Sequence, residues 1–246
     1  VYGFIMQAIG TSMSDWGTNP AQPPLAINVV KSFVGFENYH NIMTDLLEFS
    51  FRNSLINTFF FTVFFVAGCL GVGLFLALLL DQNVMGEGLF RTIFLFPMAL
   101  SFVVTGTIWR WMFLEDYGLL QAWLRPIFGD SIYITPSGAM GIVILASVWR
   151  AVAFTVVLFL GALQTVSNEV LESSSLDGAN RFQRFFYVIF PLIRPTFLIA
   201  VLLTSIRSVN SVGLILATTK GGPGTSTETA SVFLYDVTWG QGNFAR

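Results

Sequence analysis

The segment LESSSLDGANRFQRFFYVIFPLIRP, at Leu171–Pro195, determines how the rest of the chain is interpreted. It contains five charged residues, although only 11% of the 246 residues are charged, and it has prolines at positions 191 and 195. Long apolar runs precede and follow it. A charged segment between two membrane-type runs is expected to lie outside the hydrocarbon core, because polar groups without partners are costly in lipid.

The composition predicts an all-α membrane protein. The chain is 54% hydrophobic and 11% charged, whereas a soluble domain carries about 25% charged residues. The net charge of −2 gives no reason to expect a nucleic-acid partner. With Cys69 as the one cysteine and His40 as the one histidine, neither an internal disulfide nor a His/Cys metal cluster can form. No catalytic triad, P-loop or dinucleotide-binding motif is present in the sequence.

Four apolar stretches are long enough to cross a bilayer, since a helical span needs about 20 mainly apolar residues. They are predicted at residues 55–80, 89–113, 138–163 and 196–218. Gly68, Gly71 and Gly73 predict close helix contacts in the first span, and Pro97 predicts a kink in the second. Residues 1–10 are apolar but too few to cross.

The connectors between these spans must alternate between the two sides of the membrane. Residues 81–88 and 166–195 then share one side, and residues 11–51, 114–137 and 220–246 share the other. Lysine and arginine are distributed almost evenly between the two sides, so the positive-inside rule favours the first side as cytoplasmic only slightly.

The segment at 166–195 has the local signals of two short helices joined at a glycine. Ser167 is a suitable N-cap for a helix over 166–177, and Gly178 is a natural stop. A second helix is expected near Asn180, with Gln183 as its capping-box partner. Pro191 is expected to end this helix.

The second short helix has an aromatic face. Its members recur at helical spacing and are Phe182, Phe185, Phe186 and Ile189. This face predicts a segment pressed against the membrane or the spans. On local physics alone, an interfacial loop that merely lies on the bilayer explains the segment equally well.

The spacing of several residues in this segment is similar to a known pattern. Glu172, Ser173, Ser174, Gly178, Val188, Phe190 and Pro191 follow the spacing of the "EAA…G…I-x-L-P" loop of ABC importer permeases. The two alanines of that loop are serines here, its isoleucine is valine and its leucine is phenylalanine. These exchanges keep small residues small and apolar residues apolar.

Two further segments resemble the sugar-permease branch of this family, of the maltose/glycerol-3-phosphate type. They are FVGFENYHNI at residues 33–42 and TKGGPGTSTETASVFLYD at residues 219–236. The resemblance implies a single permease domain over residues 1–246, with the helix bundle of a type I ABC importer. Such a subunit has six core spans, so we expect part of the first and the last to be absent from this sequence.

The resemblance also implies partners and a role for the loop at 166–195. That loop would be a cytoplasmic pair of coupling helices that docks on an ATPase subunit. The coupling residues would be Glu172, Ser173, Ser174, Asp177, Gly178, Ala179 and Pro191. The partners would be a second permease subunit, two ATPase subunits that bind ATP and Mg²⁺, and an extracytoplasmic solute-binding protein. This chain would be no enzyme, would hold no cofactor and would lie in a prokaryotic cytoplasmic membrane.

Two arginines, Arg150 and Arg207, lie within predicted spans that contain no Asp or Glu. A charged residue at bilayer depth is a functional candidate. On a helix, Thr204, Arg207, Ser208 and Ser211 form a polar stripe suited to sugar hydroxyls, and Ser205 and Asn210 lie off it. The resemblance adds a second group of site residues, Ser147, Ala151 and Phe154, in the span that contains Arg150. Hydrogen bonding between helices remains the alternative for the stripe, and pairing with the partner permease remains the alternative for Arg150.

The sequence therefore predicts a permease subunit that helps to form the pathway for a mono- or oligosaccharide. Glycerol-3-phosphate or another small polar solute is the alternative cargo. Two arginines disfavour polyamines, and an ion-coupled transporter would be expected to carry acidic residues in its spans. A membrane scaffold without transport activity would leave the charged loop unexplained.

Overall fold

The computed structural model describes residues 2–16, 32–44, 49–82, 87–115, 117–128 and 135–240. Its helices before the charged loop are α1 (Tyr2–Ser12), α2 (Glu37–Thr44), α3 (Phe49–Leu80), α4 (Glu87–Ala99), α5 (Phe102–Met112), α6 (Leu119–Phe128) and α7 (Pro136–Leu163). Those that follow are α8 (Asn168–Leu176), α9 (Arg181–Arg184), the π-helix η2 (Phe185–Ile189), α10 (Phe190–Val209), α11 (Val212–Thr218), α12 (Ala230–Tyr235) and the π-helix η3 (Asp236–Gly240). Parts of the connectors predicted at 11–51, 81–88, 114–137 and 220–246 lie outside these residues.

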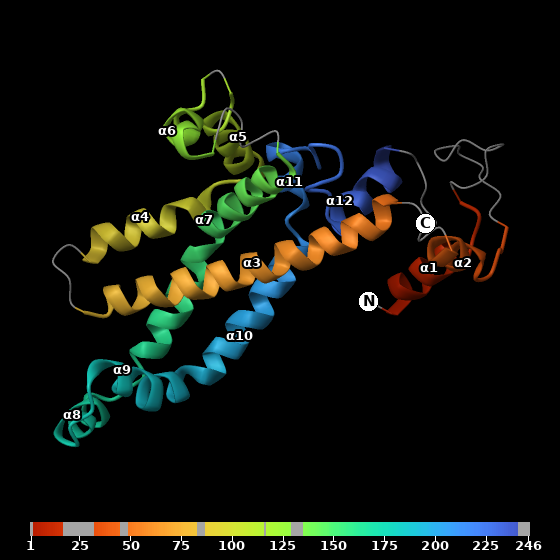
Figure 1. The fold of residues 1–246 in the computed structure, drawn as a ribbon. Coiled ribbons are helices and arrows are strands. Elements are labelled where there is room, and N and C mark those ends of the chain that lie inside the picture. The colour runs from red at the N-terminus through yellow and green to blue at the C-terminus, as the bar shows by residue number, and fades with distance from the viewer. Residues whose placement is uncertain are drawn as a thin grey trace.

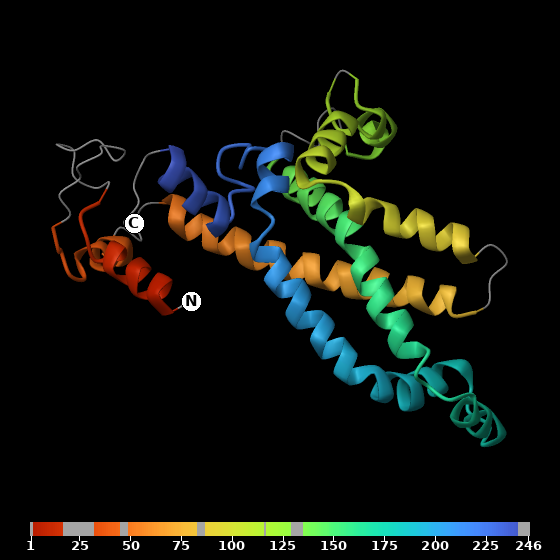
Figure 2. The same cartoon turned by 180° about the vertical axis from the view of Figure 1, so that it is seen from behind.

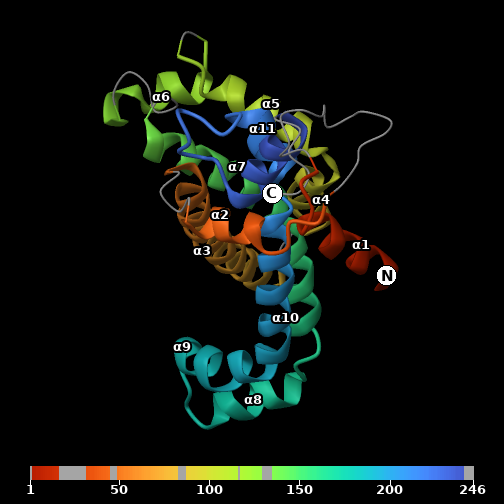
Figure 3. The ribbon, with the colours of Figure 1, turned by 90° about the vertical axis from the view of Figure 1, so that its right-hand side faces the viewer.

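The helices form an elongated bundle with different elements at its two ends (Figures 1, 2 and 3). The helices α8 and α9 lie at one end, and α5, α6 and α11 lie toward the other. Of the described helices, α3, α7 and the helix over 181–209 are long and apolar enough to cross a membrane, and α4 with α5 forms a bent fourth candidate.

The packing of α3 against α7 forms the centre of the bundle. A Cβ atom on Gly68 would lie 2.8 Å from Cγ2 of Val148, and one on Gly73 would overlap Thr155. The Thr155 hydroxyl donates to the Cys69 carbonyl oxygen across this contact, at 2.8 Å. Gly68 and Gly73 therefore permit the close approach that the sequence predicts, whereas Gly71 has open space around it and does not.

The predicted span at 89–113 is broken rather than kinked. The helices α4 and α5 meet at an angle of 108°. Pro97 has no N–H to continue the helical hydrogen bonding, and α4 ends two residues later. Ser101 then begins a new helix, since its side chain accepts a hydrogen bond from the Val104 N–H at 3.2 Å.

Pro191 does not end the second short helix, which corrects the sequence-based expectation. Helix α9 continues through η2 into α10, so that one helix extends from Arg181 to Val209. The Phe190 N–H bonds to the Phe185 carbonyl, five residues back. This wider turn directly precedes Pro191 and relieves the crowding that a proline ring causes in a regular α-helix.

The predicted span at 196–218 is also interrupted. Helix α10 ends at Val209, and α11 begins at Val212 after a break at Asn210 and Ser211. Helix α11 packs closely on α5, where a Cβ atom on Gly106 would lie 2.9 Å from the Leu214 carbonyl oxygen. Two broken helices therefore lie against each other near one end of the bundle.

The segment that follows α11 is fastened to α3. The Asn57 amide donates to the carbonyl oxygens of Thr225 and Glu228, at 2.8 and 3.0 Å. The Thr58 hydroxyl accepts a hydrogen bond from the Ala230 N–H at 2.8 Å. These bonds hold the glycine-rich segment and α12 at the N-terminal end of α3, far from α8 and α9 (Figure 1).

Helices α1 and α2 form a small unit near the N-terminal end of α3 (Figures 1 and 3). The Asn38 amide donates to the carbonyl oxygens of Ser12 and Ser14, at 2.9 and 2.8 Å. A β-bridge pairs Ser14 with Phe33. The segment at 33–42 therefore lies against α1 through local polar contacts.

Candidate functional site

The turn between α8 and α9 depends on Gly178. Its φ angle is +80°, in the left-handed region that glycine adopts without a steric penalty. The Ala179 N–H bonds to the Ser174 carbonyl at 3.1 Å, and the Gly178 N–H bonds to the Ser175 carbonyl at 3.2 Å. These two bonds make a Schellman motif, which ends α8 with its last carbonyls satisfied.

Helix α9 begins with a complete capping box. The Asn180 side chain accepts from the Gln183 N–H, and the Gln183 side chain accepts from the Asn180 N–H, each at 2.9 Å. The Arg184 guanidinium donates to the Ser175 hydroxyl at 2.9 Å and so links α9 back to α8. The angle between the two short helices is therefore fixed by hydrogen bonds from both sides of Gly178.

The structure places most of the predicted coupling residues at the surface of the loop. The exposed members are Glu172, Ser173, Asp177, Gly178 and Pro191, whereas Ala179 is half-buried and Ser174 is buried. The Ser174 hydroxyl donates to the Leu171 carbonyl at 2.8 Å. On the aromatic face, Phe182 and Phe186 are also exposed. The loop therefore presents a carboxylate and aromatic rings that have room for a partner surface.

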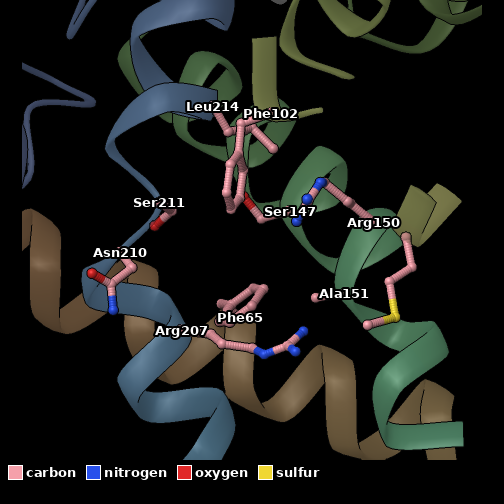
Figure 4. A pocket seen from close by; sticks show the side chains of 10 residues that line it. Phe65, Phe102, Ser147, Arg150, Ala151, Arg207, Asn210, Ser211 and Leu214 are labelled. Carbon is pink, nitrogen blue, oxygen red and sulfur yellow. The ribbon is translucent and has the colours of Figure 1, made fainter. Parts of the chain in front are cut away.

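A cavity of about 300 Å³ lies between the helices at the level of both helix breaks. Its lining residues come from six helices and one break; they are Phe65, Met98, Phe102, Ser147, Arg150, Ala151, Arg207, Asn210, Ser211 and Leu214 (Figure 4). The volume lies at the lower end of the range for small-molecule sites. Phe102 follows the break between α4 and α5, and Ser211 lies in the break between α10 and α11. Irregular backbone at membrane depth is tolerated where it lines a cavity, so both breaks fit a ligand pathway.

Arg150 enters the cavity from α7, and its guanidinium group is held by one hydrogen bond and one aromatic ring. Its Nε–H donates to the Leu100 carbonyl oxygen at 3.1 Å, a backbone group that the break after α4 leaves outside the helical pattern. The guanidinium also stacks on the Phe102 ring, with 3.8 Å between its central carbon and the ring centroid. Arg150 therefore connects α7 to the break between α4 and α5 and keeps its terminal nitrogens near the cavity.

Arg207 enters the same cavity from α10. Its guanidinium stacks on the Phe154 ring of α7, with 4.0 Å between its central carbon and the ring centroid. Figure 4 shows the side chains of Arg150 and Arg207 directed into the space beside Ala151. The two cations therefore face one cavity from different helices.

Five of the eight predicted substrate residues line the cavity, and three do not. The five are Ser147, Arg150, Ala151, Arg207 and Ser211. Thr204 is fully buried, and its hydroxyl donates to the Ala200 carbonyl at 2.6 Å. Ser208 shares a hydrogen bond of 2.9 Å with the Thr62 hydroxyl of α3. Phe154 lies beneath Arg207, where it stacks with the guanidinium.

The sequence reasoning missed five lining residues: Phe65, Met98, Phe102, Asn210 and Leu214. Four of these are apolar residues within apolar runs, so their type carries no signal. Asn210 was placed off the polar stripe by counting along a continuous helix, but α10 ends at Val209 and the 100° step no longer holds. The polar pair Asn210–Ser211 within an apolar run was the available signal for the break.

Substitutions at Ser208 distinguish a packing role of its hydroxyl from a role in solute binding. We expect Ser208→Leu to abolish uptake while the ATPases stay bound, because the larger side chain must fit between α10 and α3 at a cost of about 1–3 kcal/mol. Ser208→Ala should retain uptake, since the bond to Thr62 contributes only about 0.6 kcal/mol. Uptake and co-purification of the complex measure both results. Loss of uptake with alanine would instead assign the hydroxyl to the solute.

Comparison with known proteins gives the family. Residues 69–245 match the model of the binding-protein-dependent transport system inner membrane component. A probable ABC transporter permease protein of Pyrococcus horikoshii is 34% identical over 100% of this chain and 82% of its own length. An sn-glycerol-3-phosphate transport system permease protein of Agrobacterium fabrum is 33% identical over 86% of this chain and 72% of its own. A trehalose/maltose transport system permease protein of Thermococcus litoralis is 31% identical over 84% of this chain and 70% of its own.

Solved structures share the fold. One chain in a bacterial ABC transporter involved in import of the acidic polysaccharide alginate matches with a TM-score of 0.72, at 20% identity over 98% of this chain and 80% of its own. A second, in an alginate ABC transporter in complex with a pentasaccharide-bound periplasmic protein, matches with a TM-score of 0.68, at 20% identity over 85% of this chain and 75% of its own. Together with the family match and the helix bundle, these similarities show that the chain belongs to the binding-protein-dependent transport system inner membrane component family and is a permease subunit of an ABC importer.

Proposed function

We propose that this permease subunit imports a sugar, a mono- or oligosaccharide, in response to ATP hydrolysis by partner subunits. A second permease subunit completes the pathway, two ATPase subunits bind ATP and Mg²⁺, and an extracytoplasmic solute-binding protein delivers the solute. The membrane is the cytoplasmic membrane of a prokaryote, with α8 and α9 on its cytoplasmic side. The names of the relatives support a sugar or a related polyol derivative as cargo.

The observation that carries this proposal is the continuous helix from Arg181 to Val209. It begins at the capping box of α9 and reaches Arg207 beside the cavity, a path of about 40 Å at 1.5 Å per residue. No loop interrupts it, so a displacement of the α8–α9 pair is transmitted to Arg207 as a rigid-body motion. Docking of α8 and α9 on an ATPase therefore couples nucleotide-driven closure to the shape of the cavity.

The cavity lies beside the middle of α3 and α7 and the C-terminal end of α10. Its polar groups, such as Ser147 and Asn210, alternate with the aromatic rings of Phe65 and Phe102. Convergent polar groups on an otherwise apolar wall are typical of small-molecule sites. A sugar presents the matching combination, because its hydroxyls form hydrogen bonds and its C–H face packs on rings.

Reconstitution of the complete importer tests the proposal. We expect uptake into proteoliposomes that requires ATP, the ATPases and the solute-binding protein together. Glu172→Lys should lower binding-protein-stimulated ATPase activity and uptake in parallel, by roughly 10-fold or more, because it reverses an exposed charge at the proposed docking surface. Glu172→Gln is the matched control and should retain more activity. ATP-independent uptake, or coupled uptake in Glu172→Lys at the wild-type rate, would contradict the assignment.

A further inference from the structure

The cavity combines two cationic side chains with walls that hold no carboxylate among the described residues. Arg150 and Arg207 both line it, and its other lining residues are uncharged. A cation at membrane depth is costly unless a counter-charge or water accompanies it. Two cations that face one cavity also repel each other, so a counter-charge between them is favourable and the cavity suits an anion.

The hydrogen-bond donors of the cavity point to the same conclusion. The hydroxyls of Ser147 and Ser211 donate to the carbonyl oxygens of Val143 and Ser208. The Asn210 amide donates to the Ile206 carbonyl at 3.0 Å. The donors that remain for a ligand are mainly the guanidinium N–H groups, and these match an acceptor with several oxygens and no proton.

The two guanidinium groups are also held ready for a ligand. The Arg150 Nε–H is bonded to the Leu100 carbonyl and its ring partner is Phe102, which leaves its terminal nitrogens without a hydrogen-bond partner in the described part of the chain. Arg207 is held by its stacking on Phe154 and forms no hydrogen bond with a described residue. Side chains whose guanidinium groups are already held in place lose little further conformational freedom when an oxyanion binds.

We infer that the imported solute is anionic, and that Arg150 and Arg207 bind its oxyanion in this cavity. This inference rests on the proposed function and names its substrate class: a sugar or polyol that carries a carboxylate, phosphate or similar group. The rings of Phe65 and Phe102 are the apolar surface for the remainder of a small solute. A carboxylate of the second permease subunit is the competing counter-charge, and the experiment below separates the two.

The test compares matched neutral and anionic solutes in the complete importer, reconstituted in proteoliposomes with its solute-binding protein. The pairs are glucose with glucuronate, and glycerol with glycerol-3-phosphate, so that carboxylate and phosphate are distinguished. We expect uptake of at least one anion to exceed that of its neutral partner by 10-fold or more. Arg207→Gln and Arg150→Gln should each lower that anion's uptake by roughly 10- to 100-fold, the effect of losing one charge-assisted hydrogen bond.

Two further variants identify the cause of such a loss. Arg207→Lys keeps the charge and should retain part of the preference for the anion. Arg110→Gln removes an arginine of α5 that does not line the cavity, and it should leave the preference unchanged. The solute-binding protein is identical in every reaction, so a change in preference among the variants reports on the permease.

The outcomes separate this inference from the proposed function. Uptake of only the neutral member of each pair, or of no anion, overturns the inference; if the solute-binding protein still stimulates the ATPases, the importer assignment stands. An unchanged preference in both glutamine variants also overturns it. Failure of the two glutamine variants to assemble with the partner permease, with uptake of both members of each pair lost together, would instead assign the arginines to the partner permease and overturn the inference.

Discussion

Proline at position 178 is expected to abolish uptake while the protein still inserts into the membrane. Gly178 has a φ angle of +80°, whereas a proline ring holds φ near −65°. Proline also removes the Gly178 N–H, which bonds to the Ser175 carbonyl at 3.2 Å. We expect a cost of about 3 kcal/mol or more, which corresponds to a loss of over 100-fold in a docking equilibrium. Uptake and binding-protein-stimulated ATPase activity are the measurements.

Asparagine is the matched control at this position. It tolerates the left-handed conformation better than other non-glycine residues, and a Cβ atom on Gly178 would meet nothing within 4 Å. Gly178→Asn should therefore keep uptake within about 5-fold of the wild type, since the strain is below about 1 kcal/mol. Wild-type uptake by Gly178→Pro would show that the geometry of this turn is not needed for coupling.

Most of the local structure of the loop at 166–195 could be predicted because its signals are local. The stop at Gly178 and the capping box of Asn180 with Gln183 each depend on residues within four positions of one another. Ser167 occupies the N-cap position of α8 as predicted, but its side chain forms no capping hydrogen bond. Pro191 was misjudged because its effect depends on the turn before it. A regular α-helix would be disrupted there, but the π-helix over 185–189 accommodates the ring.

The two helix breaks could not be placed from hydropathy. An apolar run of sufficient length indicates a span, but its hydropathy carries no information about the direction of the helix axis. The break after α4 is stabilised by Arg150, which lies 50 positions later and donates to the Leu100 carbonyl. The direction of α11 depends on its packing against α5. Both are contacts between distant parts of the chain. The local signals at the breaks, Pro97 with Ser101 and the pair Asn210–Ser211, do not give the direction of the helix that follows.

The residues that line the cavity could also be predicted only in part from the sequence. Charged and hydroxyl residues within apolar spans are rare enough to be recognised, and Arg150, Arg207, Ser147 and Ser211 all line the cavity. Thr204 and Ser208 are also hydroxyl residues of α10, but they bond within the bundle. The Thr204 hydroxyl donates to a carbonyl of its own helix, and the Ser208 hydroxyl bonds to Thr62 of α3. Residue type therefore identifies candidates, whereas the packing of the helices decides which of them reach the cavity.

The contact between α5 and α11 leaves no room for a larger side chain at Gly106, and both helices supply walls of the cavity. A Cβ atom on Gly106 would lie 2.6 Å from the Ala217 Cβ and 2.9 Å from the Leu214 carbonyl oxygen. The second of these is backbone and cannot move aside without the helix. Gly106→Val should therefore separate α5 from α11 and displace Phe102 and Leu214, at a cost of about 1–3 kcal/mol or more.

We expect Gly106→Val to lower the thermal unfolding midpoint of the purified complex by several degrees and to reduce uptake by roughly 10-fold or more. Gly213→Ala is the matched control on the facing helix: its added methyl group would lie 3.5 Å from the Phe102 Cβ, an ordinary van der Waals contact. This control should leave both measurements close to the wild type. Equal tolerance of the two substitutions would mean that α5 and α11 separate freely during transport, and the cavity would then lack the fixed wall that its ligand requires.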